Sequence, residues 1–143
     1  MDGAYQEIAE ALLRATAASR VTVRLERPGA TLPVVAEALA EGIPSIQTPS
    51  TIDLRAAPTV IHLQETLGTL IQSDLLATDT PPPPELIRQY GARAQMLAAV
   101  AVDGSLAGIV SVHWSPGPRE WTAAEVAALE AAAAQVAELV RQA

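Results

Sequence analysis

The chain has 143 residues, half of them apolar, and 16 acidic residues against nine basic ones give it a net charge of −7. This length fits one domain, which can bury a hydrophobic core without a disulfide or a structural metal. The sequence contains no Cys, Lys, Asn or Phe, which excludes thiolate and Schiff-base catalysis, cysteine metal sites, lysine phosphate loops and N-glycosylation.

The acidic charge and the lack of an Arg-rich run argue against direct binding to nucleic acid, because acidic groups repel its phosphates. No apolar run approaches the ~20 residues of a membrane span. Residues 1–7 are acidic and polar, and they lack the basic and then apolar pattern of a signal peptide. We therefore expect a soluble, cytoplasmic protein with a single domain over residues 1–143.

The beginning of the chain predicts a helix and two strands. Residues 3–18 are rich in Ala and Leu, and the spacing indicates a helical face made of Tyr5, Ile8, Leu12, Ala15 and Ser19. Residues 20–27 alternate between apolar and polar side chains, which predicts a half-buried strand. Residues 33–40 predict a second strand, although their Ala and Glu content also permits a helix.

The middle of the chain predicts short elements joined by loops. In order, these are a loop at 43–57, a helix that begins at Pro58 and ends before Gly68, a strand at 70–74, a stiff spacer at 78–84 and a short helix at 85–90. Pro58 suits the first turn of a helix, and the four prolines at 81–84 favour an extended spacer.

The strongest pair of strands comes next, at 95–102 and 106–114. Asp103-Gly104 joins them, and both residues tolerate the positive φ that a two-residue hairpin turn requires. Alternation places Ala107, Ile109, Ser111 and His113 on one face of the second strand. The other face, which suits packing beneath helices, then consists of Leu106, Gly108, Val110, Val112 and Trp114.

A helix at 122–142 closes the chain. Thr122 and Glu125 have the spacing of a capping box, and Trp121 and Val126 that of a hydrophobic staple. An apolar seam with heptad-like spacing runs along the helix through Val126, Leu129, Ala133, Val136 and Val140. This seam and the apolar face of the first helix could build a dimer, or both could pack against the chain's own sheet.

Antiparallel strands between terminal helices indicate the α+β class. The segment VAVDGSLAGIVSVHW, followed by PREWTAAEVAALEAAAAQVAELV, resembles the GAF domain family, and the resemblance extends over residues 11–140. It implies an antiparallel sheet of five or six strands, with the terminal helices on one face and a loop-covered pocket on the other. Members of the family bind small ligands such as cyclic nucleotides, bilins, haem, nitrate or 2-oxoacids, or they dimerise.

The resemblance implies a set of pocket positions, which are Gln95, Leu97, Ala99, Ile109, Ser111 and His113. Arg88 and Tyr90 are further candidates near the roof of the pocket, together with Arg55 and Arg93. An Arg would suit an anionic ligand, and Tyr90 could stack on a ligand or simply pack. His113 could instead end its strand in solvent. His62 suits a solvated helix face, but together with His113 it could bind haem or a metal.

Catalysis has little support in the sequence. Side chains two residues apart on a strand, such as Ser111 and His113, lie about 6–7 Å apart, which is too far for a direct nucleophile–base hydrogen bond. The resemblance implies one enzymatic branch of the family, the free methionine sulfoxide reductases, which work through Cys. Covalent bilin attachment also uses Cys. The chain has no Cys, so both are excluded. Noncovalent bilin binding would require aromatic walls, and the chain has no Phe and two Tyr.

We therefore expect a noncatalytic, sensory or regulatory domain that binds a small metabolite, for which an anion is one candidate, with no cofactor. The alternative is a dimerisation or scaffold module with a vestigial pocket, and a more remote one is a haem-binding sensor. We also expect a homodimer through the terminal helices and a signal that passes to a second copy or to a signalling protein partner.

Overall fold

The computed structural model describes residues 2–46, 54–82, 84, 87–88 and 91–143. Along the chain, the elements are α1 (Asp2–Thr16), β1 (Arg20–Leu25), β2 (Val34–Leu39), the 3-10 helix η1 (Leu54–Ala56), α2 (Pro58–Thr66), β3 (Thr69–Gln72), β4 (Ala94–Val102), β5 (Ser105–Trp114) and α4 (Ala123–Gln142). The segment at 33–40 is therefore a strand. The loop predicted at 43–57 and the helix predicted at 85–90 lie partly outside the described residues.

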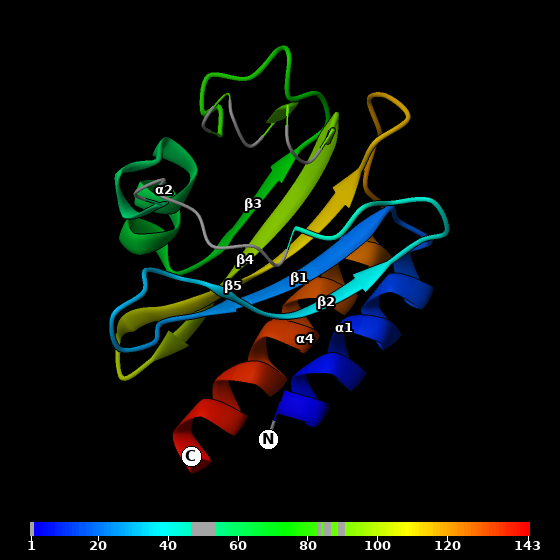
Figure 1. The fold of residues 1–143 in the computed structure, drawn as a ribbon. Coiled ribbons are helices and arrows are strands. Elements are labelled where there is room, and N and C mark those ends of the chain that lie inside the picture. Colours follow the sequence, from blue (N-terminus) through cyan, green and yellow to red (C-terminus); the bar gives the residue numbers. More distant parts are fainter. Residues whose placement is uncertain (1, 47–53, 83, 85–86, 89–90) are drawn as a thin grey trace.

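The five strands form one antiparallel sheet in the order β2-β1-β5-β4-β3. Helices α1 and α4 lie side by side against one face of this sheet, and α2 lies on the opposite side (Figure 1). We call these the helix face and the pocket face. The predicted α+β class and the antiparallel sheet are confirmed, with five strands.

The hairpin between β4 and β5 follows the prediction at its turn. Asp103 and Gly104 both have positive φ, at 53° and 78°, and the last residue pair before the turn is Val102 with Ser105. This backbone conformation is the one that a two-residue hairpin turn requires.

The helix face carries the main hydrophobic core. Its largest members include Val21, Val23, Met96, Val110, Val112 and Leu129, and each of these side chains is fully buried. The apolar seam of α4 packs into this core through Leu129, Ala133 and Val136. The seam therefore faces the chain's own sheet.

On α1, the structure corrects the predicted buried face. Tyr5 and Leu12 are buried as expected, but Ala15 is exposed and Thr16 takes the buried position. The Thr16 hydroxyl donates a hydrogen bond of 2.9 Å to the Leu12 carbonyl. A buried hydroxyl is therefore compatible with the core, because the helix backbone supplies its partner.

The structure also corrects one strand face. Val100 pairs with Gly108, but Ala101 pairs with Leu106, so β5 has one extra residue at a β-bulge. The alternation shifts at this point, and Leu106 packs with the apolar residues of the pocket face instead of the helix face. Gly108 permits the close approach, since a Cβ there would lie 2.2 Å from the Arg24 carbonyl oxygen.

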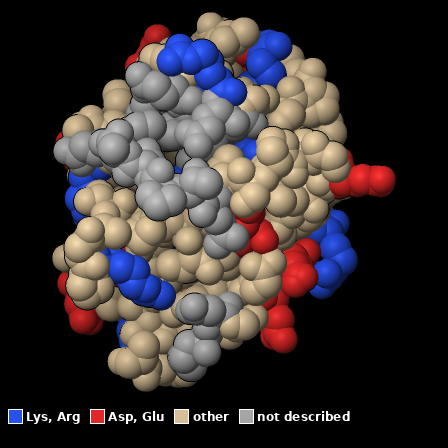
Figure 2. All heavy atoms as spheres, in the orientation of Figure 1, with Lys and Arg blue, Asp and Glu red and all other residues tan. Residues whose placement is uncertain are grey.

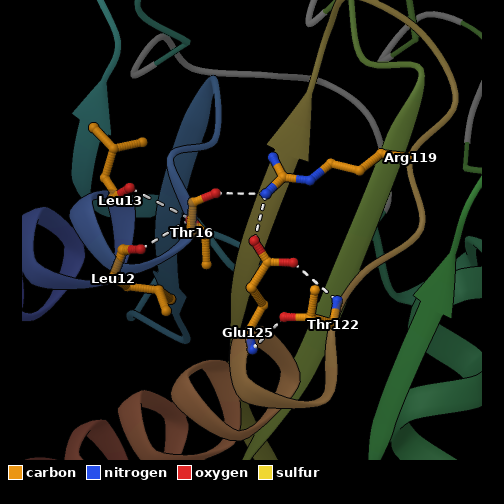
Figure 3. Close-up of polar contacts among 6 residues, drawn as sticks. All are labelled: Leu12, Leu13, Thr16, Arg119, Thr122 and Glu125. Atoms are coloured by element: carbon orange, nitrogen blue, oxygen red, sulfur yellow. Dashed lines mark hydrogen bonds and ion pairs between the residues drawn. The ribbon is translucent and has the colours of Figure 1, made fainter.

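The amino end of α4 meets the end of α1 at a cluster around Arg119 (Figure 3). The predicted capping box between Thr122 and Glu125 is present. The Arg119 guanidinium donates to the Thr16 carbonyl and to the Glu125 carboxylate, and it lies 4.7 and 4.4 Å from the ring centres of Trp114 and Trp121. This cluster ties both terminal helices to the end of β5.

Candidate functional site

The pocket face of the sheet carries a buried block of polar side chains. Strand pairing places Arg20 opposite His113 and Thr22 opposite Ser111, and it places Gln95 on the far side of His113. All five side chains are buried, with at most 5% of their surface exposed. Burying so many polar groups is unfavourable unless they have partners or a function.

Above this block lies a partly open cavity of about 50 Å³. The described residues that line it are Arg24, Leu54, Thr59, Val60, Leu75, Pro82, Ile87, Ala92, Gln95, Leu97, Ile109, Ser111 and His113. Most of these are apolar, and they come from β1, β4 and β5 below and from η1, α2 and residues 75–92 above. The cavity thus has an apolar wall and a partly polar floor.

Five of the six pocket positions that the resemblance implies come together at this cavity, namely Gln95, Leu97, Ile109, Ser111 and His113. Ala99 is half-buried beside the apolar cluster of the pocket face and is not part of the cavity lining. Arg88 is exposed and also lies outside the lining. Tyr90 lies outside the described residues.

His113 is buried, so the alternative that it ends the strand in solvent is wrong. Burial lowers the pKa of His113 to about 3, and the positive charges of Arg20 and Arg24 contribute further. The imidazole is therefore neutral at physiological pH, and it can serve as both a donor and an acceptor of hydrogen bonds.

Two glutamines link the floor of the cavity to a segment above it. Gln95 Nε2 donates to Gln72 Oε1 at 2.7 Å, and Gln72 Nε2 donates to the Thr78 hydroxyl at 3.0 Å and to the Thr80 carbonyl at 2.6 Å. These bonds hold residues 78–80 against the end of β3. Gln72 falls within the short strand predicted at 70–74, and the sequence pattern gives no sign of this role.

The arginines proposed near the roof have other partners. Arg55 pairs with Glu26 at 2.9 Å and also donates to Gln64, and Arg93 lies 3.7 Å from Asp74. The basic residues beneath the cavity are instead Arg20 and Arg24, which the sequence analysis missed. The two residues lie four positions apart on the polar face of the predicted strand, and the sequence does not show that this face lies beneath the cavity.

Arg20 forms a buried ion pair that anchors the chain after β2. Its guanidinium lies 3.9 Å from the Glu37 carboxylate and donates to the Pro44 carbonyl at 2.8 Å. The same carboxylate accepts hydrogen bonds from the Ser45 hydroxyl and the Ile46 amide. The charge of Arg20 is thus largely neutralised by Glu37 within the protein.

The described residues do not bring together the two histidines that the haem or metal alternative would use. His62 is half-buried on α2 and is not part of the cavity lining. Among the described residues, no group of three or more His, Asp or Glu could hold a metal ion. A macrocycle would also need far more room than about 50 Å³, because pockets for drug-sized ligands typically measure about 300–1,000 Å³.

On the molecular face that Figure 2 shows, basic and acidic side chains are interspersed along the rim and do not form one continuous basic surface. In the part of the chain that the structure describes, no helix is both long enough and apolar enough to span a bilayer.

Comparison with known proteins places these observations in a family. Residues 1–140 match the family described as "GAF domain". The fold is similar to that of the cyanobacteriochrome TePixJ GAF domain, with a TM-score of 0.83 and 19% identity over 99% of this chain and 89% of that one. No curated protein matches the sequence.

Two further solved structures have the same fold. The blue-light-absorbing form of the Thermosynechococcus elongatus PixJ GAF domain has a TM-score of 0.70 and 20% identity over 98% of this chain and 89% of that one. The chromophore-binding domain of the Stigmatella aurantiaca bacteriophytochrome has a TM-score of 0.79 and 15% identity over 100% of this chain and 55% of that one.

Proposed function

The chain belongs to the GAF domain family, and we propose that it is a noncatalytic sensory domain that binds a small, anionic metabolite in the cavity above its pocket face. The observation that carries this proposal is the convergence of Gln95, Ser111 and His113 on one apolar cavity. Apolar walls with a few well-placed polar groups are typical of small-molecule sites. Arg24, which lines the cavity, favours a negatively charged ligand.

The state of His113 supports a noncatalytic role. A general base works best when its pKa lies near the operating pH, whereas burial and the nearby arginines lower the pKa of His113 to about 3. Ser111 lies two residues away on the same strand face, a separation of about 6–7 Å along the strand. The pair therefore suits the orientation of a ligand better than nucleophilic attack.

A chromophore is the other ligand class that the similar structures suggest, since one of them is a chromophore-binding domain. The chain has no Cys for covalent attachment, and a cavity of about 50 Å³ is far smaller than the roughly 300–1,000 Å³ of pockets for drug-sized ligands. A small metabolite therefore requires much less rearrangement of the covering segments than a tetrapyrrole would.

A thermal-shift screen with nucleotides, oxoacids and inorganic oxyanions tests the proposal. Ligands that bind the folded state raise the midpoint of unfolding. We expect at least one compound to stabilise the wild-type protein by several degrees. Ser111→Leu, which fills the cavity, should abolish the shift, and Ser105→Leu at an exposed position should preserve it. The proposal fails if no compound stabilises the protein or if Ser111→Leu responds like the wild type.

The homodimer, the signalling partner and the cytoplasmic location stay predictions. The apolar seam that favours a dimerisation module packs against the chain's own sheet, so a dimer would have to use other faces of the terminal helices. A mass measurement in solution over a range of concentrations tests this, and a monomer at every concentration would exclude a stable homodimer.

A further inference from the structure

A row of polar side chains crosses the sheet beneath the cavity. Strand pairing places Gln72 on β3 opposite Gln95 on β4, and it places Gln95 opposite His113 on β5. Gln72 and Gln95 are both buried, with 5% and 4% of their surface exposed. Gln95 and His113 line the cavity, whereas Gln72 does not. Gln72 can therefore influence a ligand only through its neighbour Gln95.

The hydrogen bonds of Gln72 fix the direction in which its amide points. Gln72 Nε2 donates to the Thr80 carbonyl at 2.6 Å, and a backbone carbonyl can only accept a hydrogen bond. The NH₂ group of Gln72 must therefore face residues 78–80, and its Oε1 must face Gln95. The surrounding network is what distinguishes the two ends of an amide, so this orientation follows from the partners themselves.

The orientation of Gln72 determines that of Gln95 in turn. Because Gln72 Oε1 is an acceptor, Gln95 meets it with its NH₂ group, and Gln95 Nε2 donates to it at 2.7 Å. A reversed Gln95 amide would place two carbonyl oxygens against each other. Within the described part of the chain, this is the hydrogen bond that the Gln95 amide makes. Gln95 Oε1 is therefore an acceptor left for whatever occupies the cavity.

Ser111 supplies a second polar group at this end of the cavity. Its side chain is buried and lines the cavity, and Ser111 pairs with Leu97, two residues along β4 from Gln95. Diagonal neighbours on one sheet face have Cβ atoms about 7–8 Å apart, which a long side chain such as glutamine can span. A serine hydroxyl can donate or accept a hydrogen bond. One ligand group between them can therefore contact both side chains.

A hydroxyl group matches this pair, because it has one donor for Gln95 Oε1 and acceptor lone pairs for Ser111. A ketone or an ether in the same place can only accept, so it would leave Gln95 Oε1 without a donor. Sites that hydrogen-bond a hydroxyl discriminate against an analogue that lacks it, because the buried polar group of the site is then unpaired.

We propose that Gln72 is a positioning residue that turns the Gln95 carbonyl group toward the cavity, and that the site thereby selects a ligand with a hydroxyl group over the corresponding oxo compound. This inference rests on the proposed function, because it specifies a group of the ligand in the same cavity. It does not depend on the charge of the ligand. It adds a determinant of specificity that lies outside the cavity lining.

Calorimetric titration of the full chain with pairs of compounds that differ in this group tests the inference. The pairs are cyclopentanol with cyclopentanone, lactate with pyruvate, and glycerol 3-phosphate with dihydroxyacetone phosphate. They represent a neutral ligand and two kinds of anion. In every pair that binds, we expect the hydroxyl member to bind at least about tenfold more tightly than the oxo member.

Variants of the glutamines show whether this preference comes from the amide orientation. Gln72→Met keeps the length of the side chain but removes the acceptor for Gln95, so the Gln95 amide can turn over and the preference should fall below about threefold. Gln95→Met should abolish the preference. Gln135→Met, the same change at an exposed position on α4, should keep it in full. A merely structural role of Gln72 would weaken both members of a pair equally and leave their ratio unchanged.

The outcomes separate this inference from the proposed function. The inference is wrong if the oxo member of a pair binds as tightly as the hydroxyl member, or if Gln72→Met keeps the wild-type ratio. If Gln72→Met does not fold, as circular dichroism would show, the ratio in Gln95→Met decides, and a retained preference contradicts the inference. The proposed function would survive each of these results if Ser111→Leu still abolished binding. Absence of binding for every compound, in this titration and in the thermal-shift screen, would overturn both.

Discussion

Alternate residues of the same strands build the two faces of the sheet, yet the faces have opposite chemistry. On the helix face, Val21, Val23, Val110 and Val112 are fully buried in an apolar core. On the pocket face, Arg20, Thr22, Ser111 and His113 are buried to almost the same extent, but they are polar. Burial of apolar groups stabilises the fold, whereas burial of polar groups costs stability unless every group is paired. The helix face therefore holds the fold together, and the pocket face is where we propose that a ligand binds.

The largest expected effect is at the β-bulge, where the two faces exchange residues. In Gly108→Ala, the new Cβ would lie 2.2 Å from the Arg24 carbonyl oxygen and 2.6 Å from Leu25 Cδ2. Because the nearer neighbour is backbone, β1 and β5 must separate, and we expect a loss of about 3 kcal/mol or more in the free energy of unfolding. Urea denaturation measures this loss.

Gly117→Ala is the control for this substitution, because a Cβ at Gly117 meets nothing within 4 Å. It should change the free energy of unfolding by less than about 0.5 kcal/mol. Equal stabilities for the two variants would mean that Gly108 is not the point of close contact.

The next prediction compares the faces through neighbouring residues on one strand. Val110→Ala removes two methyl groups from the core of the helix face, and we expect a loss of about 2 kcal/mol. Ser111→Ala, at the adjacent position on the pocket face, should cost less than about 1 kcal/mol. Urea denaturation of both variants under the same conditions gives the comparison directly. A larger loss in Ser111→Ala would show that the pocket face also contributes strongly to stability.

The pocket face should also have a pH signature. The pKa of His113 is about 3 in the folded state against an ordinary value of 6.5, so between these two values the unfolded chain binds a proton that the folded chain does not. The free energy of unfolding therefore falls as the pH drops below 6.5, by up to about 1.4 kcal/mol per pH unit from this residue, and is unaffected above it.

His113→Gln removes this contribution and keeps a polar side chain of similar size. The variant should lose less stability than the wild type between neutral pH and about pH 5, by up to about 2 kcal/mol. Chemical denaturation across this pH range measures the difference. Parallel pH profiles for the two proteins would mean that His113 titrates normally, and hence that it is accessible to solvent.

The sequence predicts those features of the fold that depend only on residues close together in the chain. Asp103-Gly104 predicts the hairpin turn, and Thr122 with Glu125 predicts the helix start, since both depend on neighbouring residues. Alternation also places Ser111 and His113 on the pocket face, because the bulge lies before them.

The parts that the sequence analysis missed depend on contacts between distant segments. A single extra residue in β5 moves Leu106 to the other face, and Gly108 was the signal for this, because glycine within a strand often marks a bulge. Arg20 and Arg24 were missed because only the pairing of β1 with β5 shows that their face lies beneath the cavity. On α1, Ala15 and Thr16 both fit a helical spacing, and the sheet decides between them.

The smallest expected effect concerns the Arg119 cluster, where partly buried polar groups are all paired, in contrast to Thr22 on the pocket face, whose buried hydroxyl has no partner among the described residues. Thr122→Ala removes the side-chain cap of α4 and should lower the free energy of unfolding by about 1 kcal/mol. Burial alone would raise the pKa of Glu125, but hydrogen bonds from Thr122 and the charge of Arg119 outweigh it and hold the pKa below its ordinary value. The stabilisation from this carboxylate is therefore present above the ordinary pKa of a glutamate and is lost as the pH falls through the lower, folded-state value.

Glu125→Gln is the matched variant, because glutamine also fits a capping box but has no charge for Arg119. It should lack this loss of stability at acidic pH while it keeps most of the cap. Because the cluster lies at the junction of the terminal helices, both variants should bind a pocket ligand as tightly as the wild type, measured by the same calorimetric titration. A change in ligand affinity would contradict the separation of the two regions, and it would mean that the junction of α1 and α4 is energetically coupled to the cavity.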